Sequence, residues 1–228
     1  TRWPDLIVDV TSVSEQWTGI AVAGPKSREV LEANVKNPSE VSNDVFPFMG
    51  VIETILEGDI PCRIARISFS GELAFEVYVP SDYGPSMMDL LFNASKPLDG
   101  CLYGMEALGT LRIEKGHVTG AELDGRVTIE DAGLGKMASK QKSYIGNVLR
   151  NRPVMLEKNR PCLVGIFPKD RTQSFNAGTI LCKPDAVSGF GEGWITGATY
   201  SPALGHWIGI GFISVSYTHL TLPTNREV

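Results

Sequence analysis

Glu76 and Tyr78 are the residues whose types and spacing first suggest chemistry in this chain of 228 residues. They alternate with Phe75, Val77 and Val79, and successive side chains of a β-strand point to opposite faces. The apolar side chains would therefore share one face, and a carboxylate and a phenol would lie side by side on the other. Such a pair can form the polar floor of a pocket or can face water, and alternation alone leaves both interpretations open.

The pair is expected to be positioned by a β-hairpin. Residues 66–69 are predicted to form one strand, Ser70 and Gly71 the turn, and residues 74–79 the return strand. Further strands are predicted at residues 51–56 and 62–69, joined by a turn at 57–59, and two short β-like runs occur at residues 6–10 and 18–22.

Helices are predicted near residues 27–33, 86–95 and 104–115, and Gly116 is expected to end the last one. Arg112 lies one turn beyond Leu108 in that helix, and pairing with a structural acid is its expected role. From about residue 160, short strands alternate with turns, at 162–167, 179–182, 193–200 and 206–213. The whole pattern predicts an α+β protein with an antiparallel sheet, followed by a separate β domain.

Composition and charge narrow the classes of partner. The formal net charge is −5 and no basic stripe is present, so nucleic acid is not an expected partner. No run of about 18 apolar residues occurs, so no membrane span is expected. The four cysteines form no CxxC pair and do not cluster with histidines, so no metal site is expected. We interpret them as buried free thiols, which suits a reducing cytoplasm.

Five segments resemble one known family, in the correct order. Residues 70–80, SGELAFEVYVP, are similar to the GYTGE-x-GFE motif of the glycine-cleavage T-protein (aminomethyltransferase) family, and residues 103–117 are similar to its GL-x-ARDTLRLEAG helix. The sequence pattern YG-x-EAL…LR-x-EKG is closer to one branch of the family, the carboxy-terminal half of the α subunit of heterotetrameric sarcosine oxidase. Three later segments resemble the same branch: VTIEDAGLGKM, SYIGNVLRNRP and TGATYSPALGHWIGIG.

The resemblance implies a domain organisation. Residues 1–158 are expected to form a folate-binding sheet domain of the T-protein type, ferredoxin-like or Greek-key, that is incomplete at its N-terminus. Residues 159–214 are expected to form part of a β-barrel domain. Residues 215–228 do not continue the family, and we interpret them as a non-native tail.

The resemblance also implies which residues bind a ligand. The family's GFE glutamate accepts hydrogen bonds from the pterin edge of tetrahydrofolate, and Glu76 occupies its position. Phe69 corresponds to the aromatic residue of GYTGE, which helps to sandwich the pterin ring, and His117 corresponds to the pocket residue after EAG. Phe69 can equally be a core residue, and His117 an ordinary loop histidine. The family's key aspartate would lie upstream of residue 1, so no catalytic residue is expected in this chain.

The implied activity of the parent protein is oxidative demethylation of sarcosine to glycine, with transfer of the one-carbon unit to tetrahydrofolate as 5,10-methylenetetrahydrofolate. FAD, FMN and NAD would bind outside this chain, which has no GxGxxG motif. The expected partners are the N-terminal part of the same subunit and the β, γ and δ subunits, and the fragment alone is expected to be inactive. Two alternatives stay open. An aminomethyltransferase would have Arg and Asp where Leu108 and Gly109 stand, and a non-catalytic folate-binding or assembly module would need no flavin partner.

Overall fold

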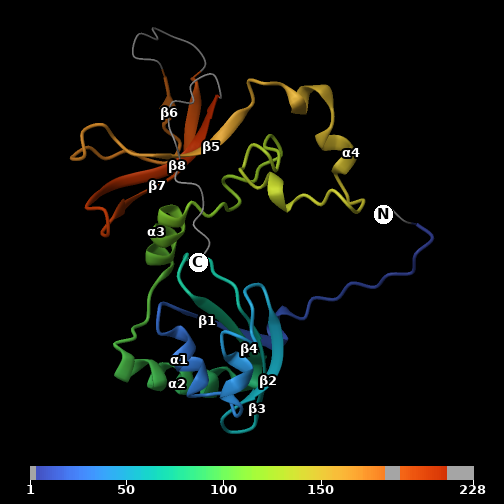
Figure 1. The fold of residues 1–228 in the computed structure, drawn as a ribbon, viewed down its shortest axis with the longest axis vertical. Coiled ribbons are helices and arrows are strands. Elements are labelled where there is room, and N and C mark those ends of the chain that lie inside the picture. The colour runs from blue at the N-terminus through green and yellow to red at the C-terminus, as the bar shows by residue number, and fades with distance from the viewer. Residues whose placement is uncertain (1–3, 183–190, 215–228) are drawn as a thin grey trace. The chain divides into compact units, whose positions relative to one another are not determined.

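The computed structural model describes residues 4–182 and 191–214, and it divides the chain into two compact units, Thr1–Tyr103 and Gly104–Val228. Each unit is built on one four-stranded antiparallel sheet (Figure 1). Helices accompany both sheets, which confirms the predicted α+β class. The expected tail at residues 215–228 lies outside the described residues.

The first unit contains strands β1 (Trp17–Ala23), β2 (Val51–Leu56), β3 (Ile60–Ala65) and β4 (Ala74–Pro80), arranged in the order β1-β4-β3-β2. Helices α1 (Ser27–Glu32) and α2 (Gly84–Ser95) pack against one face of this sheet (Figure 1). Short 3₁₀ turns lie at Ser14–Gln16, Pro38–Val41, Ser81–Tyr83 and Lys96–Leu98.

The alternation in β4 explains which face the helices cover. Phe75, Val77 and Val79 are fully buried, and they pack in one core with Leu31 of α1 and Met87 of α2. Burial of each such side chain contributes about 1.5–3 kcal/mol, so the apolar residues fix the register of the strand. The side chains between them in sequence therefore point to the opposite face of the sheet.

The structure corrects the predicted hairpin. The strand that precedes β4 and pairs with it is β3, Ile60–Ala65, and residues 66–73 form the connection between the two strands. The strand does not continue past Ala65 because the main chain of Arg66 bonds elsewhere: its N–H donates to the carbonyl of Gly50, and its carbonyl accepts from Met49, both at 2.9 Å. The turn predicted at 57–59 and the strand predicted at 51–56 are confirmed.

The run at residues 6–10 was also expected to be β-like, and it is not a strand in the structure. Its side chains from Leu6 to Val10 are exposed, so no apolar face is buried against a neighbour. A β-prone run without a partner strand gains neither ladder hydrogen bonds nor burial.

The second unit contains β5 (Pro161–Ile166), β6 (Ile180–Leu181), β7 (Gly193–Ser201) and β8 (His206–Ser214), arranged in the order β5-β8-β7-β6. Its helices are α3 (Met105–Lys115) and α4 (Asn147–Arg150), and 3₁₀ turns lie at Gly135–Met137 and Pro153–Leu156. Ile113 of α3 packs on Ile208 and Ile210 of β8, and the Thr110 hydroxyl lies 2.7 Å from that of Thr199.

These contacts explain why α3 belongs to the second compact unit, although the T-protein-type domain was expected to extend to residue 158. Gly197 of β7 allows α3 to approach closely, because an added Cβ there would lie 3.0 Å from Nη2 of Arg112. The assignment of residues 1–158 and 159–214 to two family domains stays a prediction.

Candidate functional site: a carboxylate on the open face of a sheet

Glu76 lies on the face of β4 opposite the helices, next to small residues. Its register partners are Ala21 on β1 and Ala65 on β3, so no large side chain stands directly beside the carboxylate. Tyr78 lies two residues further along β4, opposite Gly19 of β1. A Cβ added to Gly19 would lie 2.7 Å from Cε1 of Tyr78, so the phenol ring rests against the glycine. The face thus presents a carboxylate between two alanines and a phenol between Gly19 and Arg63.

Tyr78 orients the carboxylate. Its hydroxyl donates a hydrogen bond to Oε2 of Glu76. This bond, helped by burial and by the charge of Glu76, raises the pKa of Tyr78 to about 12. The phenol therefore stays protonated at neutral pH and remains a donor. An ionised carboxylate has about four lone-pair positions, so Glu76 can still accept two N–H groups from a ligand.

Phe69 lies in the connection that leads into β4. Ser68 closes this connection by accepting from the N–H of Gly71 at 3.0 Å. The carbonyl of Leu73 accepts from the N–H of Gly24 and the hydroxyl of Ser27, both at 2.9 Å. The Phe69 ring is 37% exposed, so it is not a fully buried core residue and retains a surface on which a flat ring could stack.

The aromatic turn at residues 45–50 is joined to the same connection. Arg66 donates from Nη1 to the carbonyl of Phe46 at 2.6 Å, in addition to its main-chain bonds to Met49 and Gly50. Phe48 and Met49 at the tip of the turn are exposed. The structure therefore brings together three segments that are far apart in sequence: residues 24–27, 45–50 and 66–73.

His117 belongs to the second unit, whereas Glu76 and Phe69 belong to the first. It follows the C-terminus of α3, where Gly116 has a φ of 76° and allows the chain to turn. Burial lowers the pKa of His117, and the positive charges of Lys115 and Arg112 lower it further. The imidazole is therefore neutral at pH 7, with one nitrogen that donates and one that accepts.

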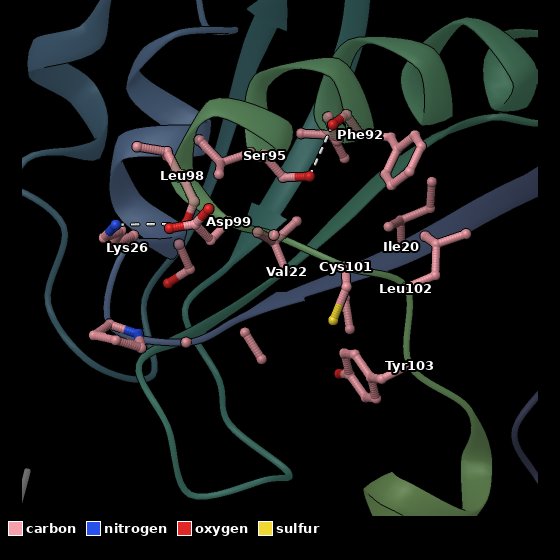
Figure 2. Close-up of a pocket in the computed structure, with 18 of the residues that line it drawn as sticks. Ile20, Val22, Lys26, Phe92, Ser95, Leu98, Asp99, Cys101, Leu102 and Tyr103 are labelled. Atoms are coloured by element: carbon pink, nitrogen blue, oxygen red, sulfur yellow. Dashed lines mark hydrogen bonds between the residues drawn. The ribbon is translucent and has the colours of Figure 1, made fainter.

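A cavity of about 410 Å³ lies at the outer edge of β1, the edge strand of the first sheet (Figure 2). Ile20 and Val22 of β1, Phe92 of α2 and Leu102 give it an apolar lining, and Lys26 closes one end by donating to the carbonyl of Leu98 at 3.5 Å. Glu76, Phe69 and His117 do not line this cavity. This cavity is thus distinct from Glu76 and Tyr78, which lie on the open face of the sheet.

Two expectations about other sites can be compared with the structure. In the described part of the chain, no group of three or more His, Cys, Asp or Glu side chains is placed to hold a metal ion. All four cysteines are free, but only Cys62 is buried; Cys101 and Cys182 are exposed and Cys162 is intermediate. The interpretation of all four as buried thiols is therefore wrong, because apolar neighbours in sequence do not guarantee burial at strand ends and in loops. Among the described helices, none has the length and apolar character needed to span a membrane.

Sequence reasoning missed two features. The first is the pair of small residues on β1 beside Glu76 and Tyr78. The sequence WTGIAVA indicates this feature, because its alternate residues Gly19 and Ala21 are both small. Glu122, the acid that pairs with Arg112, is fully buried, and nothing in its acidic surroundings in sequence distinguishes it from a surface residue. The expectation that Arg112 pairs with a structural acid is confirmed.

Comparison with known proteins identifies the family to which the chain belongs. The family model described as the GCVT N-terminal domain matches residues 1–142, and the chain belongs to this family of T-protein domains. The sarcosine oxidase α subunit of Corynebacterium sp. (strain U-96) is 40% identical over 218 residues, which are 93% of this chain and 22% of that subunit. The corresponding subunit of Rhizobium meliloti is 39% identical over 215 residues, with 92% and 22% covered.

More distant relatives carry the aminomethyltransferase name. The protein of Halothermothrix orenii is 29% identical over 209 residues, which are 90% of this chain and 55% of that protein. The crystal structure of the glycine cleavage system aminomethyltransferase T from Bartonella henselae has a TM-score of 0.66 at 22% identity, covering 88% of this chain and 52% of that one, and it supports the fold alone. The resemblance to the T-protein family and its sarcosine oxidase branch is confirmed. The chain spans about a fifth of the length of the sarcosine oxidase relatives.

Proposed function

We propose that this chain is the tetrahydrofolate-binding module of a sarcosine oxidase α subunit. The observation that carries the proposal is the orientation of Glu76: a carboxylate held by Tyr78 on an open sheet face, with alanines on both sides. In this proposal the first sheet is the ferredoxin-like part of a T-protein domain, and the second sheet is part of its barrel.

The chemistry of the carboxylate matches the edge of a pterin. The pterin 2-amino group and the adjacent ring N–H form a pair of donors, and an ionised carboxylate can accept both in a charge-assisted bidentate pair. The alanines Ala21 and Ala65 leave room for a flat ring beside Glu76. Phe69 would stack on the ring, and the neutral His117 would offer one donor and one acceptor.

The proposed role in the parent reaction follows from this binding. A flavin-bearing part of the protein would oxidise sarcosine to an imine, and the folate held here would take up its one-carbon unit, giving glycine and 5,10-methylenetetrahydrofolate. FAD, FMN and NAD are assigned to parts of the complex outside this chain, together with the β, γ and δ subunits, and the complex is expected in the cytoplasm. The fragment itself would contribute binding and orientation.

The helix α3 favours this proposal over an aminomethyltransferase. An aminomethyltransferase is expected to use an arginine and an aspartate at the positions of Leu108 and Gly109, and neither residue type is present. In the structure, Gly109 faces open space, so a side chain is not excluded there by packing. The difference from an aminomethyltransferase at these positions therefore changes the chemical groups that are present, and packing does not impose it.

Substitution of Glu76 tests the binding proposal. Glu76→Gln keeps the shape but replaces one acceptor by a donor, so we expect a loss of about 2–3 kcal/mol, or roughly 30- to 150-fold in tetrahydrofolate affinity. Glu53→Gln is the matched control, because Glu53 lies on the same face of the sheet in an exposed ion pair with Arg63. Affinity measured by titration should fall only for Glu76→Gln, and equal affinity in all three proteins would remove Glu76 from the site.

Product analysis tests the proposed role in the complete complex. With Glu76→Gln, sarcosine oxidation should continue, since the flavin site is elsewhere, while formaldehyde replaces 5,10-methylenetetrahydrofolate as the product. Loss of flavin turnover as well would instead assign Glu76 a structural role.

A further inference from the structure

Two half-buried arginines of the first unit lie close together. Arg28 belongs to α1, and Arg66 is the first residue after β3. Burial lowers the pKa of Arg28, and the positive charge of Arg66 lowers it further. The two guanidinium groups are therefore neighbours, because charges separated by more than about 10 Å are largely screened. The guanidinium of Arg28 also lies 5.1 Å from the centroid of the Phe75 ring, on the face of the sheet that the helices cover.

Neutral groups hold both side chains in place. Arg28 donates from Nη1 to the carbonyl of Val41 and from Nη2 to Oδ1 of Asn43, the latter at 3.4 Å. Arg66 donates from Nη1 to the carbonyl of Phe46 at 2.6 Å. Each guanidinium has five N–H donors, so most of the donors of this pair are not used by these bonds.

No carboxylate is ion-paired with either arginine. Among the ion pairs of the described residues, none includes Arg28 or Arg66. Glu32, one turn further along α1, raises the pKa of Arg28, but this is the smallest of the three effects on it. Two like charges thus remain together in a half-buried place, although the net charge of the chain is −5.

One donor of this pair is buried without an acceptor. Nε of Arg66 is shielded from solvent, and it makes no hydrogen bond in the described structure. A buried donor that lacks a partner is unfavourable, and such atoms often mark the place of a group that the protein binds. The unpaired Nε and the unneutralised charge of the two arginines therefore both call for an anion.

A purely structural role is the alternative explanation. The bonds of the two arginines do tie residues 41–46 to α1 and to the end of β3. An amide side chain can donate to a carbonyl as well, however, and it brings no charge repulsion. The structural role thus explains why donors are present, and it explains neither the pair of charges nor the buried Nε of Arg66.

We propose that Arg28 and Arg66 form a binding site for an oxyanion, the carboxylate or phosphate group of a small ligand. A guanidinium presents its donors in a planar fork that matches both kinds of anion. One oxyanion between the two groups would accept from both, offset their repulsion and give Nε of Arg66 an acceptor. The site does not depend on the function proposed above, because Glu76 projects from the opposite face of the sheet.

Titration of the full chain with inorganic phosphate tests the proposal. Chloride should keep the ionic strength constant, so that general screening does not change. The Nε–H resonances of Arg28 and Arg66, followed by NMR, should shift with phosphate and reach saturation. Those of Arg63, which is exposed and ion-paired with Glu53, should not. Phosphate should also raise the Tm, since a ligand that binds the folded state stabilises it.

Substitution of each arginine assigns the binding to the pair. Arg28→Gln and Arg66→Gln each remove one charge and keep an amide donor, so each should weaken phosphate binding roughly tenfold or more. Arg63→Gln is the matched control and should bind phosphate as wild type does. If Arg66→Gln fails to fold, Arg28→Lys makes the same test, because it keeps the charge and loses the planar fork.

Competition identifies the source of the anion. Tetrahydrofolate carries glutamate carboxylates, and displacement of phosphate by tetrahydrofolate would assign the site to the tail of the folate. Phosphate that stays bound would assign the site to a different anionic ligand.

Two results would overturn the proposal. The first is a set of resonance shifts that grow with phosphate without saturating, and the second is equal phosphate affinity in Arg28→Gln, Arg66→Gln and Arg63→Gln. Either result would leave the function proposed for Glu76 intact, since that function is tested by the folate affinity of Glu76→Gln.

Discussion

Tyr78 and Glu76 act as one hydrogen-bonded group on the open face of β4. The bond fixes the carboxylate before a ligand arrives, which reduces the ordering that binding would otherwise require. Gly19 supports this geometry, since any side chain there would displace the Tyr78 ring. The recognition proposed for this site therefore depends on a phenol and a glycine as well as on the acid.

The titration of Tyr78 should report the bond directly. Its pKa is raised to about 12 from an ordinary value of 10.0, mainly by the hydrogen bond to Glu76. Because the pKa is raised in the folded protein, the bond stabilises the fold fully below pH 10 and loses its effect as the pH rises towards 12. Tyrosinate absorbance, taken as the difference between wild type and Tyr78→Phe, should show this high pKa.

Glu76→Gln removes the charged acceptor of this hydrogen bond, so the pKa of Tyr78 in that variant should lie closer to its ordinary value of 10.0. An unchanged titration curve in Glu76→Gln would show that the bond does not exist in solution.

Only part of this site is predictable from sequence. The alternation in β4 places Glu76 and Tyr78 on one face, and the family motifs select Glu76, Phe69 and His117. Neither reveals that Tyr78 bonds to Glu76, because a bond between side chains on one face depends on rotamers. The buried position of Glu122 is likewise invisible, since it follows from how a loop folds around Arg112 and not from any periodicity.

The elements differ in how well their sequences specify them. The helix predicted at 104–115 is observed as α3 and ends before Gly116 as expected, and the side chain that it buries is Ile113. The hairpin prediction failed at residues 66–69, where apolar and polar residues alternate but the main chain of Arg66 bonds to the turn at residues 49–50. Alternation describes a local preference, and the choice of partner strand is set by contacts distant in sequence.

Gly109 inside α3 and Gly116 directly after it give a prediction about this element. Gly109 lies inside the helix with open space around it, so Gly109→Ala should raise the free energy of unfolding by about 0.5–1 kcal/mol. Gly116 has a φ of 76°, so Gly116→Ala should lower that free energy by about 1–2 kcal/mol. Chemical denaturation of both variants checks the pair, and a loss of stability in Gly109→Ala would contradict the packing described for α3.

At the scale of the whole molecule, the chain divides into two compact units, and the residues selected by the family resemblance occur in both. Glu76 and Phe69 come from the first and His117 from the second, while the family model at residues 1–142 extends across both. A chain that covers about a fifth of its sarcosine oxidase relatives is expected to supply one function of a larger protein. Binding of folate is the function that its own residues support.

This view predicts no turnover by the 228-residue chain alone. The proposed oxidation requires a flavin, and the flavin is assigned to other parts of the complex. Incubation of the purified chain with sarcosine should therefore produce no peroxide above background, with a complete sarcosine oxidase as the positive control. Peroxide formed by this chain in proportion to its concentration would place an oxidase site within it.

The most direct test of the central claim asks whether Glu76 contacts the pterin 2-amino group. Tetrahydrofolate and an analogue without the pterin 2-amino group should be titrated into wild type and Glu76→Gln, which completes a double-mutant cycle across the proposed contact. If Glu76 accepts that amino group, the analogue should bind wild type at least roughly tenfold more weakly than tetrahydrofolate does, and the difference should largely vanish in Glu76→Gln. The same difference in both proteins would contradict the account, because the amino group would then be recognised elsewhere.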